Sequence, residues 1–482
     1  MTAAAVVALL IGLAATSSPR RIGDGGEYLA MALSYSRLRG PSIPLGEIRA
    51  IERRFPALGP TYQDVPLEDP QLRGRDGRQD YTHFWLYPAL AAAFVPVTRV
   101  SGLHPQVAFT ILNVLLLGVA AWLTLQVTTP PLGLIVLLSP VIWWVDKAHT
   151  EVFTFATLAA AVSLFARSPG SALIAFGAAA AQNLALAPAI PIAAAAALCR
   201  PAVRADWRFW RGLVCGGLLA AVSPAYYWMR LGTWSPLAPS ALGRVPSVAE
   251  WSAPLFDLNL GLIVALPWLA VALALGLWVL VRAAPARLLA PDVVVSVACA
   301  AAFLLVAAQA PNVNSGGTPG MSRYGIWFLP LAIPLLRHAG ETGRMPRWPT
   351  ALLAAASCLW CVVLFHPAVP ENYARPSRAA QWVWTTVPWA DNPLPEVFAE
   401  RASGAADWGW PPQATPGCEK VLTLGDGRAA TGPAACGTLP APADCLIVDA
   451  LCYANRRDGG YDFRPAPRQA GYLQRMHQTL GR

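Results

Sequence analysis

Residues 106–127 read QVAFTILNVLLLGVAAWLTLQV, a stretch without a single charged side chain. A helix needs about 20 mostly apolar residues to cross the hydrocarbon core of a bilayer. The stretch therefore predicts a transmembrane helix, and it indicates the class of the whole chain. Comparable apolar stretches occur on both sides of it, at 2–18, 131–145, 151–167, 170–199, 209–229, 258–281, 292–310, 324–338 and 349–366.

The composition of the 482 residues supports the same class. Hydrophobic residues make up 55% of the chain and charged residues 13%, about half of the roughly 25% usual in soluble domains. Of the 63 charges (36 basic plus 27 acidic), 19 fall in 18–85 and 22 in 371–482, which leaves 22 for the 285 residues between. So few charges cannot cover a water-soluble surface, which excludes a soluble enzyme, and the apolar content excludes disorder. The expected fold is an all-α polytopic membrane protein.

The net charge of +9 comes almost entirely from arginine, because Lys147 and Lys420 are the only lysines in the sequence. These arginines do not form the clustered basic stripe, interleaved with aromatic residues, that nucleic-acid binding requires. We interpret them mainly as signals of membrane topology, and we expect no nucleic-acid partner.

The number of crossings depends on two stretches. Residues 170–199 are one long helix or a hairpin of two short ones, and residues 82–103 span the membrane or lie as a re-entrant or interfacial helix. The positive-inside rule decides between these models. If 82–103 does not cross and 170–199 crosses twice, ten arginines face the cytoplasm and five basic residues face the outer side. This model has about eleven crossings, a cytoplasmic N-terminus and an outer C-terminus.

The two ends of the chain define the expected domains. The first apolar stretch resembles a signal peptide ending near Ala14–Thr16, but no basic residue precedes it, which favours an uncleaved anchor. We expect a transmembrane domain over 1–370, with a long outer loop at 18–105, and an extracytoplasmic domain over 371–482. Within the loop, residues 28–38 have the spacing of a short helix lying on the membrane.

Four cysteines gather in the C-terminal segment: Cys418, Cys436, Cys445 and Cys452. An even number in a segment placed outside the cell predicts two disulfides, with three possible connectivities. Zinc binding is the alternative, but no CxxC pair occurs among the four. Residues 421–424 and 445–448 are expected to form short strands.

The first candidate for chemistry is the stretch GDGGEY at 23–28, directly after the first apolar stretch. It offers two carboxylates, Asp24 and Glu27, and its glycines let a bulky ligand approach the backbone. A carboxylate near lipid is partly desolvated, which raises its pKa and its strength as a base. The alternative interpretation is a solvated turn that ends a helix.

The second candidate is the stretch WWVDKAHTEVF at 143–153, where four ionisable residues separate two apolar stretches: Asp146, Lys147, His149 and Glu151. Ionisable groups at membrane depth are functional candidates by default. Alternatively, Lys147 extends to the interface and Asp146 caps a helix. The topology model puts this cluster on the same face as Asp24, which favours the functional interpretation.

The third candidate is the glycine-rich stretch 312–324, which ends in Arg323 and Tyr324. A glycine-rich turn that enters a helix beside a guanidinium suits a phosphate, whereas an ordinary loop with a lipid-anchoring arginine is the alternative. His83 opens the 82–103 stretch beside Trp85. An interfacial aromatic belt is favoured there, with a substrate-binding role for His83 as the second option.

Taken together, these features resemble the GT-C superfamily of multi-spanning glycosyltransferases, which use polyprenyl-phosphate-linked sugars. Its members include protein O-mannosyltransferases and the lipid A aminoarabinose transferase. The family places one acid soon after the first helix and another in the next outer loop, which Asp24 (with Glu27) and Glu151 (or Asp146) match here. Residues 87–90, 231–236, 257–262 and 322–330 also resemble bacterial members. The chain differs in one respect, because its first acids are separated by two glycines instead of being adjacent.

The resemblance implies inverting sugar transfer from a polyprenyl-phosphate donor to an unknown acceptor, on the outer face of a bacterial inner membrane. Asp24, Glu27 and Glu151 would be catalytic. The donor phosphate or substrate would be bound by Arg323, Lys147, His149, Asp146, Tyr324 and His83. No cofactor is certain, and a divalent cation held by Asp24 and Glu151 is an open option. The alternatives are a membrane transporter or flippase, which needs ionisable residues in mid-helix, and a non-catalytic envelope-assembly protein.

Overall fold

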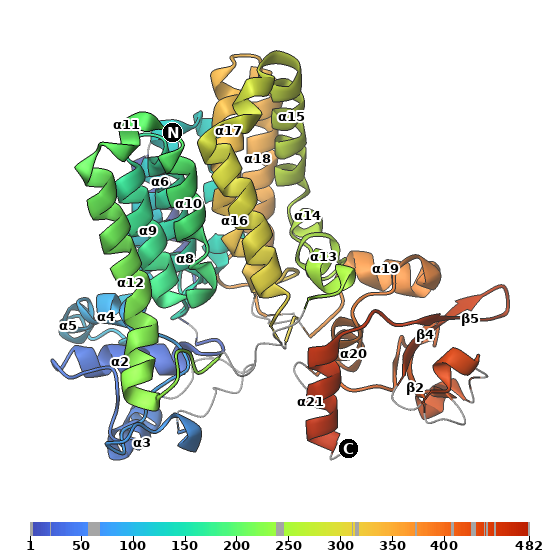
Figure 1. Cartoon of the computed structure of the whole chain (residues 1–482). Coiled ribbons are helices and arrows are strands. Elements are labelled where there is room, and N and C mark those ends of the chain that lie inside the picture. Colours follow the sequence, from blue (N-terminus) through green and yellow to red (C-terminus); the bar gives the residue numbers. More distant parts are fainter. Residues whose placement is uncertain are drawn as a thin grey trace. The chain divides into compact units, whose positions relative to one another are not determined.

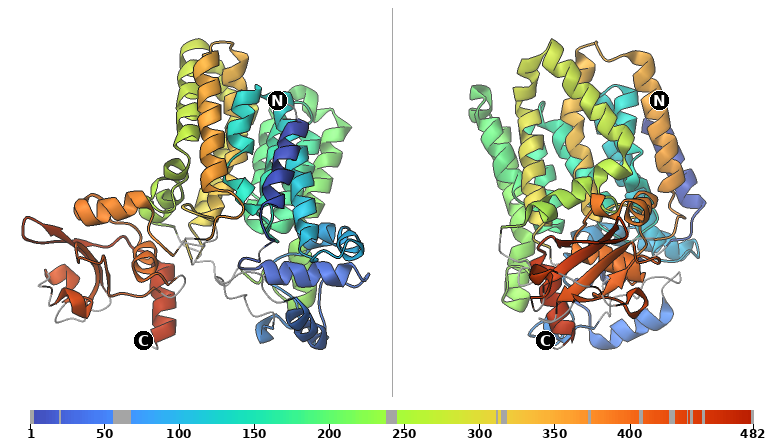
Figure 2. Two further views of the ribbon diagram at one scale, coloured as in Figure 1. Left: turned by 180° about the vertical axis from the view of Figure 1, so that it is seen from behind. Right: turned by 90° about the vertical axis from the view of Figure 1, so that its right-hand side faces the viewer.

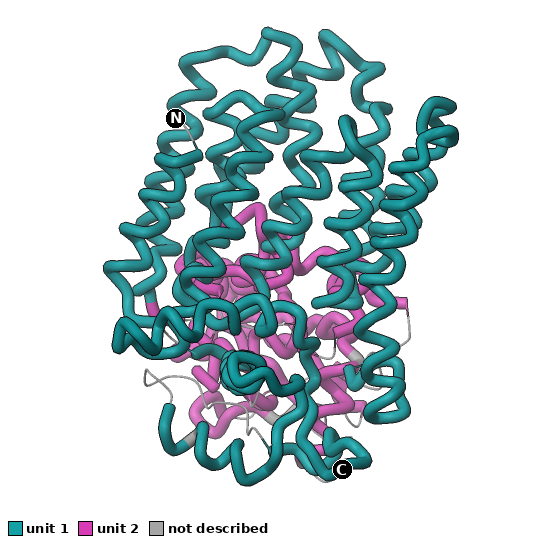
Figure 3. The backbone as a smooth tube through the Cα atoms, turned by 90° about the vertical axis from the view of Figure 1, so that its left-hand side faces the viewer, with its two compact units in different colours: residues 1–239, 266–303, 326–369 teal, residues 240–265, 304–325, 370–482 magenta. Residues whose placement is uncertain are grey.

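A computed structural model gives the fold of the chain (Figure 1). It divides into two compact units (Figure 3): unit 1 comprises 1–239, 266–303 and 326–369, and unit 2 comprises 240–265, 304–325 and 370–482. The last segment of unit 2 starts at residue 370, next to the domain boundary predicted at 370/371. Two earlier segments, 240–265 and 304–325, belong to the same unit. The structure describes residues 3–19, 21–55, 68–237, 245–310, 312–313, 318–371, 374–405, 409–425, 430–437, 439, 442–447 and 450–480.

The regular elements in the described part of unit 1 are helices, and two isolated β-bridges join Gln79 to Ile43 and Arg73. Its α-helices are α1 (Ala3–Ala15), α2 (Gly25–Tyr35), α3 (Leu45–Arg54), α4 (Leu86–Ala92), α5 (Val95–Val100), α6 (Val107–Val127), α7 (Pro130–Leu137), α8 (Glu151–Phe165), α9 (Pro169–Gln182), α10 (Ala189–Leu198), α11 (Pro201–Arg204), α12 (Trp207–Leu231), α15 (Pro267–Ala283), α17 (Ile333–Glu341) and α18 (Arg347–Leu364). Helix α16 (Pro291–Ala307) starts in unit 1 and ends in unit 2. Short 3₁₀ helices of unit 1 are η1 (Pro70–Leu72), η2 (Pro140–Trp144), η3 (Leu184–Leu186), η5 (Pro285–Leu289) and η7 (Leu329–Ala332), whereas η6 (Arg323–Trp327) starts in unit 2 and ends in unit 1.

Three described helices are long and apolar enough to cross a membrane: α6, α12 and α18. Five shorter apolar helices accompany them, at Ala3–Ala15, Glu151–Phe165, Leu184–Leu198, Pro267–Ala283 and Pro291–Ala307. The chain thus has the helices of a membrane-associated protein, but the prediction of about eleven crossings is not supported. Several of the predicted spans are divided into shorter helices.

Proline and polar residues account for these divisions, because proline lacks the N–H that a helix interior needs. Residues 131–145 form α7 and η2, which are separated at Ser139 and Pro140. Residues 170–199 form α9 and α10 with η3 between them, in agreement with the two-helix alternative. Residues 82–103 form α4 and α5, both too short to span, in agreement with the non-crossing alternative.

Glycines bring α9 and α12 into close contact. A side chain at Gly212 would overlap the backbone of Gly170, and one at Gly216 would overlap the backbone of Leu173. Small residues at such crossings let two helices in a membrane pack through their backbones. The packing fixes α12, whose C-terminal end carries Tyr226 and Arg230, the residues that bond to Asp76 and Asp80.

Helix α2 is buried on all sides from Gly25 to Ser34. The helix expected to lie on the membrane at 28–38 is therefore a core helix instead. Its apolar side chains join a cluster with Tyr87, Phe109 and Phe153, which come from α4, α6 and α8. The same cluster includes Ile43, Ile48 and Ile51, from α3 and the segment before it, and this burial depends on tertiary contacts that the spacing of α2 alone does not reveal.

Unit 2 combines helices with a small antiparallel sheet. Its helices are α13 (Val248–Phe256), α14 (Leu262–Ala265), α19 (Arg378–Thr386), η8 (Pro388–Ala390), α20 (Pro395–Ser403), η9 (Ala434–Cys436), η10 (Ala443–Cys445) and α21 (Ala470–Leu480). Its strands are β1 (Gln413–Ala414), β2 (Lys420–Gly425), β3 (Ala430–Thr431), β4 (Leu451–Arg457) and β5 (Gly460–Pro465). They are paired in the order β1-β2-β4-β5, with β3 on β2.

Two disulfides lie in unit 2, as the cysteine count predicted: Cys418–Cys436 and Cys445–Cys452. The strand expected at 421–424 lies within β2. The strand expected at 445–448 is wrong over its described residues, because Cys445 ends η10 and the next strand starts at Leu451. Pro442 is the N-cap residue of η10 and has an extended backbone. The apolar residues after it therefore begin in a 3₁₀ turn and not in a strand.

Candidate functional site

Five ionisable side chains from three segments of unit 1 meet in one place: Asp24, Glu27, His83, His149 and Glu151. Asp24 precedes α2 and Glu27 lies in its first turn, whereas Glu151 starts α8. The two histidines come from the segments before α4 and α8. All five are candidates from the sequence, and the structure places them in contact.

The contacts form a row in which acids and histidines alternate. His83 lies between two carboxylates, with Nδ1 3.0 Å from Oε2 of Glu27 and Nε2 3.2 Å from Oδ2 of Asp24. His149 continues the row, with Nε2 3.6 Å from Oδ2 of Asp24 and Nδ1 3.8 Å from Oε1 of Glu151. We call these five residues the acid–histidine row. Asp24 stands in its centre, between the two imidazoles.

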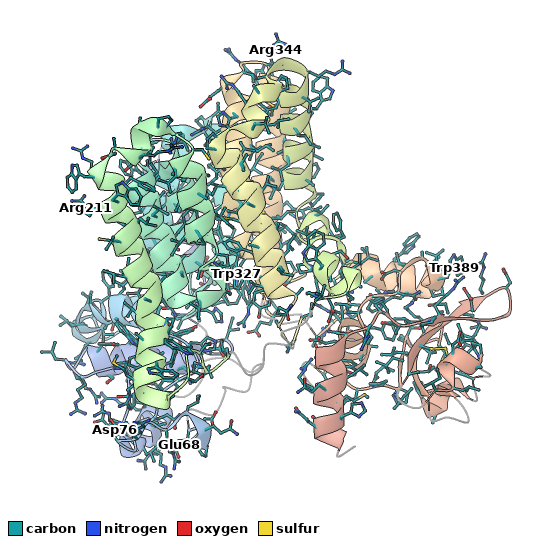
Figure 4. All side chains as sticks on the ribbon, viewed as in Figure 1. Glu68, Asp76, Arg211, Trp327, Arg344 and Trp389 are labelled. Carbon is teal, nitrogen blue, oxygen red and sulfur yellow. A yellow bond between two sulfur atoms is a disulfide. The ribbon has the colours of Figure 1, made fainter. Side chains whose placement is uncertain are left out.

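The row ends on a tryptophan that the sequence analysis missed. Trp327, labelled in Figure 4, donates a hydrogen bond from Nε1 to Oε2 of Glu151, at 3.0 Å. Tyr28 packs edge-on against both imidazoles, and Trp144 lies 4.6 Å from His149 between ring centroids. These aromatic rings restrict the rotation of the histidines. Tryptophan in an apolar stretch reads as packing, so the sequence offers no signal for the role of Trp327.

Glycine allows the two acidic segments to approach each other. A Cβ on Gly25 would lie 3.2 Å from the carbonyl oxygen of Ala148. Gly23 has a φ of +50°, a left-handed conformation that glycine adopts without strain. The GDGG turn therefore positions Asp24 against the segment that carries His149.

The turn before α8 is held by Asn113, which lies inside the apolar helix α6. Its Nδ2 lies 3.2 Å from the carbonyl oxygen of Trp144, 3.3 Å from that of Val145 and 3.0 Å from that of Lys147. Its Oδ1 accepts a hydrogen bond from the hydroxyl of Tyr87, at 2.9 Å. A single amide thus joins α4, α6 and this turn. The signal in the sequence is a lone asparagine inside the uncharged stretch 106–127, because a polar amide in an apolar helix needs a buried partner.

Burial differs along the row. Glu27 is 4% exposed and both His149 and Glu151 are buried, whereas the side chains of Asp24 and His83 are 16% and 21% exposed. Solvent and ligands therefore reach the row at Asp24 and His83. Burial raises the pKa of Glu27, the nearby charge of Asp24 raises it further, and His83 acts in the opposite direction. Helix α2 is not one of the candidate spans, so this carboxyl lies outside the membrane-spanning helices.

The exposed end of the row has the donors of a metal site. Asp24, Glu27 and His83 each offer one ligand atom, and these atoms lie within 4.8 Å of one another. Carboxylate oxygens and an imidazole nitrogen suit Mn²⁺ or Zn²⁺. The grouping differs from the pair considered from the sequence, because Glu27 and His83 accompany Asp24 in place of Glu151.

Asp146 and Lys147 lie next to the row in the sequence, but the hydrogen bonds described for them join them to each other and to backbone carbonyl oxygens. The Lys147 ammonium donates to Oδ1 of Asp146 at 2.6 Å, to the Trp143 carbonyl oxygen at 2.6 Å and to the Pro367 carbonyl oxygen at 3.0 Å. These three bonds use its three hydrogens. In this arrangement Lys147 fastens the turn to the segment after α18, and its predicted contact with a phosphate would need a rearrangement.

Arg323 and Tyr324 belong to unit 2, and the row belongs to unit 1. The guanidinium of Arg323 lies 5.4 Å from the centre of the Tyr324 ring. Helix η6 starts at Arg323, so the expected helix entry is a 3₁₀ turn. Residues 311 and 314–317 of the glycine-rich stretch lie outside the described residues. Phosphate binding by Arg323 and Tyr324 stays a prediction.

An ion-pair network holds the segment that precedes His83. Arg230, at the end of α12, donates from Nε to Oδ2 of Asp80 at 3.0 Å and through both terminal nitrogens to Asp76, at 2.8 and 2.9 Å. The hydroxyl of Tyr226 donates to the other oxygen of Asp80. Asp80 is buried, three residues before His83. Hydrogen bonds from Arg230 lower the pKa of Asp76 to about 2.

We expect Arg230→Met to loosen the segment that positions His83. The substitution leaves the buried Asp80 carboxylate without its guanidinium, a change that costs about 3–5 kcal/mol for buried ion pairs. Hydrogen exchange should then accelerate at residues 68–82. Adding Asp80→Asn to Arg230→Met should restore part of the protection, because it removes the unpaired charge. Unchanged exchange in the single variant would contradict a holding role for Arg230.

The comparisons with known proteins give this site no counterpart: no protein-family model, curated protein or solved structure matches the chain. Its chemistry is therefore inferred from the geometry and the residue types.

Proposed function

We propose that the protein is an integral membrane glycosyltransferase, which transfers a sugar from a polyprenyl-phosphate donor to an acceptor with inversion. The observation that supports it best is the acid–histidine row. Two acids that lie more than a hundred residues apart, Asp24 and Glu151, both contact the imidazole of His149, and Asp24 also contacts that of His83. Asp24 lies partly open to solvent at the centre of the row, where an acceptor hydroxyl can reach it.

In the proposed reaction Asp24 acts as the general base. It takes the proton of the acceptor hydroxyl while that oxygen attacks the anomeric carbon, and the bond between this carbon and the phosphate oxygen breaks. The polyprenyl phosphate leaves with the electron pair. A single displacement inverts the configuration and needs one base, whereas a retaining reaction needs a second carboxylate as nucleophile.

The rest of the row positions that base. His83 and His149 hold the same oxygen of Asp24 from two sides, at 3.2 and 3.6 Å. Glu27 and Glu151 in turn contact the imidazoles, at 3.0 and 3.8 Å, and fix their orientation. A divalent ion at Asp24, Glu27 and His83 would add positive charge near the leaving phosphate. Arg323 is the second source of positive charge in the proposal.

The positions of the charges favour surface chemistry over transport. Within α6, α12 and α18 the charged residues lie near helix ends: Arg208, Arg211, Arg230 and Arg347. A transporter requires ionisable residues and broken helices around a midplane site. The disulfides of unit 2 favour an oxidising compartment. We therefore propose the bacterial inner membrane as the location, with the N-terminus in the cytoplasm and unit 2 outside.

The test is a transfer assay with the purified chain in proteoliposomes. Polyprenyl-phosphate-linked hexoses and pentoses, labelled in the sugar, are offered together with an extract of envelope lipids and glycans as acceptor. We expect one donor to release polyprenyl phosphate and to label an acceptor. Absence of release from every donor, for a chain that keeps its native fold, would overturn the proposal.

We expect Glu27→Gln to shift the acidic limb of the pH–rate profile to lower pH. Burial and the charge of Asp24 raise the pKa of Glu27, so its ionisation extends the acidic limb toward neutral pH. The amide removes this ionisation from the row, which moves the limb to lower pH. The measurement is kcat/KM of transfer against pH, and Glu68→Gln, at a partly exposed acid paired with Arg49, is the matched control. An unshifted limb would separate Glu27 from the reacting base.

A further inference from the structure

Unit 2 has a surface of apolar side chains on α13. Val248, Trp251 and Phe256 are 82%, 43% and 60% exposed. At 100° per residue these three lie within one arc of the helix, together with the half-buried Leu255. The opposite arc packs inward, and it includes the helix's one charged residue, Glu250, which forms a capping box with Ser247. In α13, therefore, apolar side chains face outward and the charged side chain faces inward, the opposite of an ordinary surface helix.

Helix α19 continues this surface. Trp382 is 61% exposed and Trp389, just after the helix, is 41% exposed, whereas Trp384 points into the core. The exposed face around Trp382 carries Arg378 and hydroxyl and amide side chains, and the helix contains no acid. This mixture of tryptophan, arginine and small polar groups is typical of the interface between lipid and water.

The two helices are joined within unit 2. The backbone N–H of Ser377, which caps α19, donates to Oδ1 of Asn259, and its hydroxyl donates to the carbonyl oxygen of Leu258, directly after α13. Figures 1 and 2 show α13 and α19 next to each other along one edge of this unit. Their exposed aromatic side chains therefore belong to one part of its surface.

Short segments of the chain connect this surface to apolar helices of unit 1. Helix α14 packs against α13 and ends at Ala265, and the apolar helix α15 begins at Pro267, two residues later. On the other side, the candidate span α18 ends at Leu364, and α19 begins fourteen residues later, at Arg378. Both helices are thus tethered by short segments to helices that suit the membrane.

We propose that the α13–α19 surface docks on the lipid bilayer, in the leaflet that faces unit 2. Its apolar side chains, Val248, Trp251, Phe256, Trp382 and Trp389, enter the interfacial region, and Arg375 and Arg378 contact lipid phosphates. Both arginines are exposed, and the two helices present no exposed acid that would oppose an anionic headgroup. The inference stands independently of the proposed reaction.

The experiment is spin-label accessibility on the full chain in nanodiscs that hold one protein each and contain anionic lipid. The five free cysteines are first replaced, and labels are attached at Phe256→Cys, at Trp382→Cys and, as a control, at Asp444→Cys, an exposed position beside the sheet. We expect the ratio of oxygen to nickel-chelate accessibility to be severalfold higher at 256 and 382 than at 444, because oxygen concentrates in lipid.

A second variant distinguishes docking from a change of fold. Trp382→Asp should lower the ratio at position 256 toward that of position 444, whereas Ile447→Asp, an exposed apolar residue beside η10, should not. Equal, water-like ratios at all three labels would overturn the proposal and leave another protein as the occupant. Shielding of 256 and 382 that appears only when discs carry two copies, with dipolar broadening between labels, would also overturn it and indicate a dimer.

Discussion

Asp24→Asn is expected to lower the turnover of sugar transfer by about 10²–10⁴-fold, the usual contribution of a general base. The amide keeps the size of the side chain and a contact with each imidazole, but it cannot accept the proton of the acceptor hydroxyl. The measurement is the release of labelled sugar from the polyprenyl-phosphate donor under saturating substrate. Binding of the donor, measured separately, should change little, because the base acts on the acceptor.

The control for this variant is Glu68→Gln, which removes a carboxylate from the same outer segment but outside the row. Exposed ion pairs of this kind contribute little to stability, so transfer should stay near the parent value. Full turnover by Asp24→Asn would remove Asp24 from the base role. In that case Glu27 and Glu151, the remaining acids of the row, would be tested next in the same assay.

Asn113→Leu is expected to destabilise unit 1 by about 2–3 kcal/mol, since a buried polar group that loses its hydrogen-bond partner costs about 1–3 kcal/mol. Leucine has nearly the shape of asparagine but neither donates nor accepts a hydrogen bond. The carbonyl oxygen of Val145 and the hydroxyl of Tyr87 lose their bonds to the amide. The carbonyl oxygens of Trp144 and Lys147 lose it too, but each keeps a backbone N–H donor. The free energy of unfolding by SDS in mixed micelles is the measurement, and transfer activity should fall with it.

Tyr87→Phe is the graded partner of that variant. It removes one hydroxyl and therefore one hydrogen bond to Oδ1 of Asn113, and leaves the three carbonyl contacts in place. A neutral hydrogen bond contributes about 1 kcal/mol, so its effect should be the smaller of the two. Equal effects of Tyr87→Phe and Asn113→Leu would show that the amide does not hold the turn before α8.

The sequence predicts the candidate site better than it predicts the membrane helices. Asp24 and Glu151 could be singled out because ionisable residues at the ends of apolar stretches are uncommon and conspicuous. The pairing of His83 with Asp24 and Glu27 could not, because it depends on how the segment before α4 folds back over α2. That path is fixed by tertiary contacts such as Arg230 with Asp80, which join residues 150 positions apart.

The helices were misjudged for a related reason. Hydropathy averages over a window and does not register a single proline, such as Pro140 or Pro267, at which an apolar run is divided. The even count of cysteines predicts two disulfides but leaves three connectivities open, and the structure pairs the cysteines that are neighbours along the chain, Cys418 with Cys436 and Cys445 with Cys452. The sequence indicates that Lys147 is a cation available to a ligand, whereas in the structure its ammonium donates to three acceptors within the protein.

The central claim is that the segment after α1 and the segment before α8 share one site. Oxidative cross-linking of Asp24→Cys with His149→Cys tests it, in a chain without the five free cysteines and with a protease site inserted at the exposed turn 101–103. We expect the two fragments to stay joined after cleavage until they are reduced, whereas Asp24→Cys with Thr129→Cys, beyond the far end of α6, should separate. Fragments that separate with 24 and 149, or join equally with 129, would contradict the account.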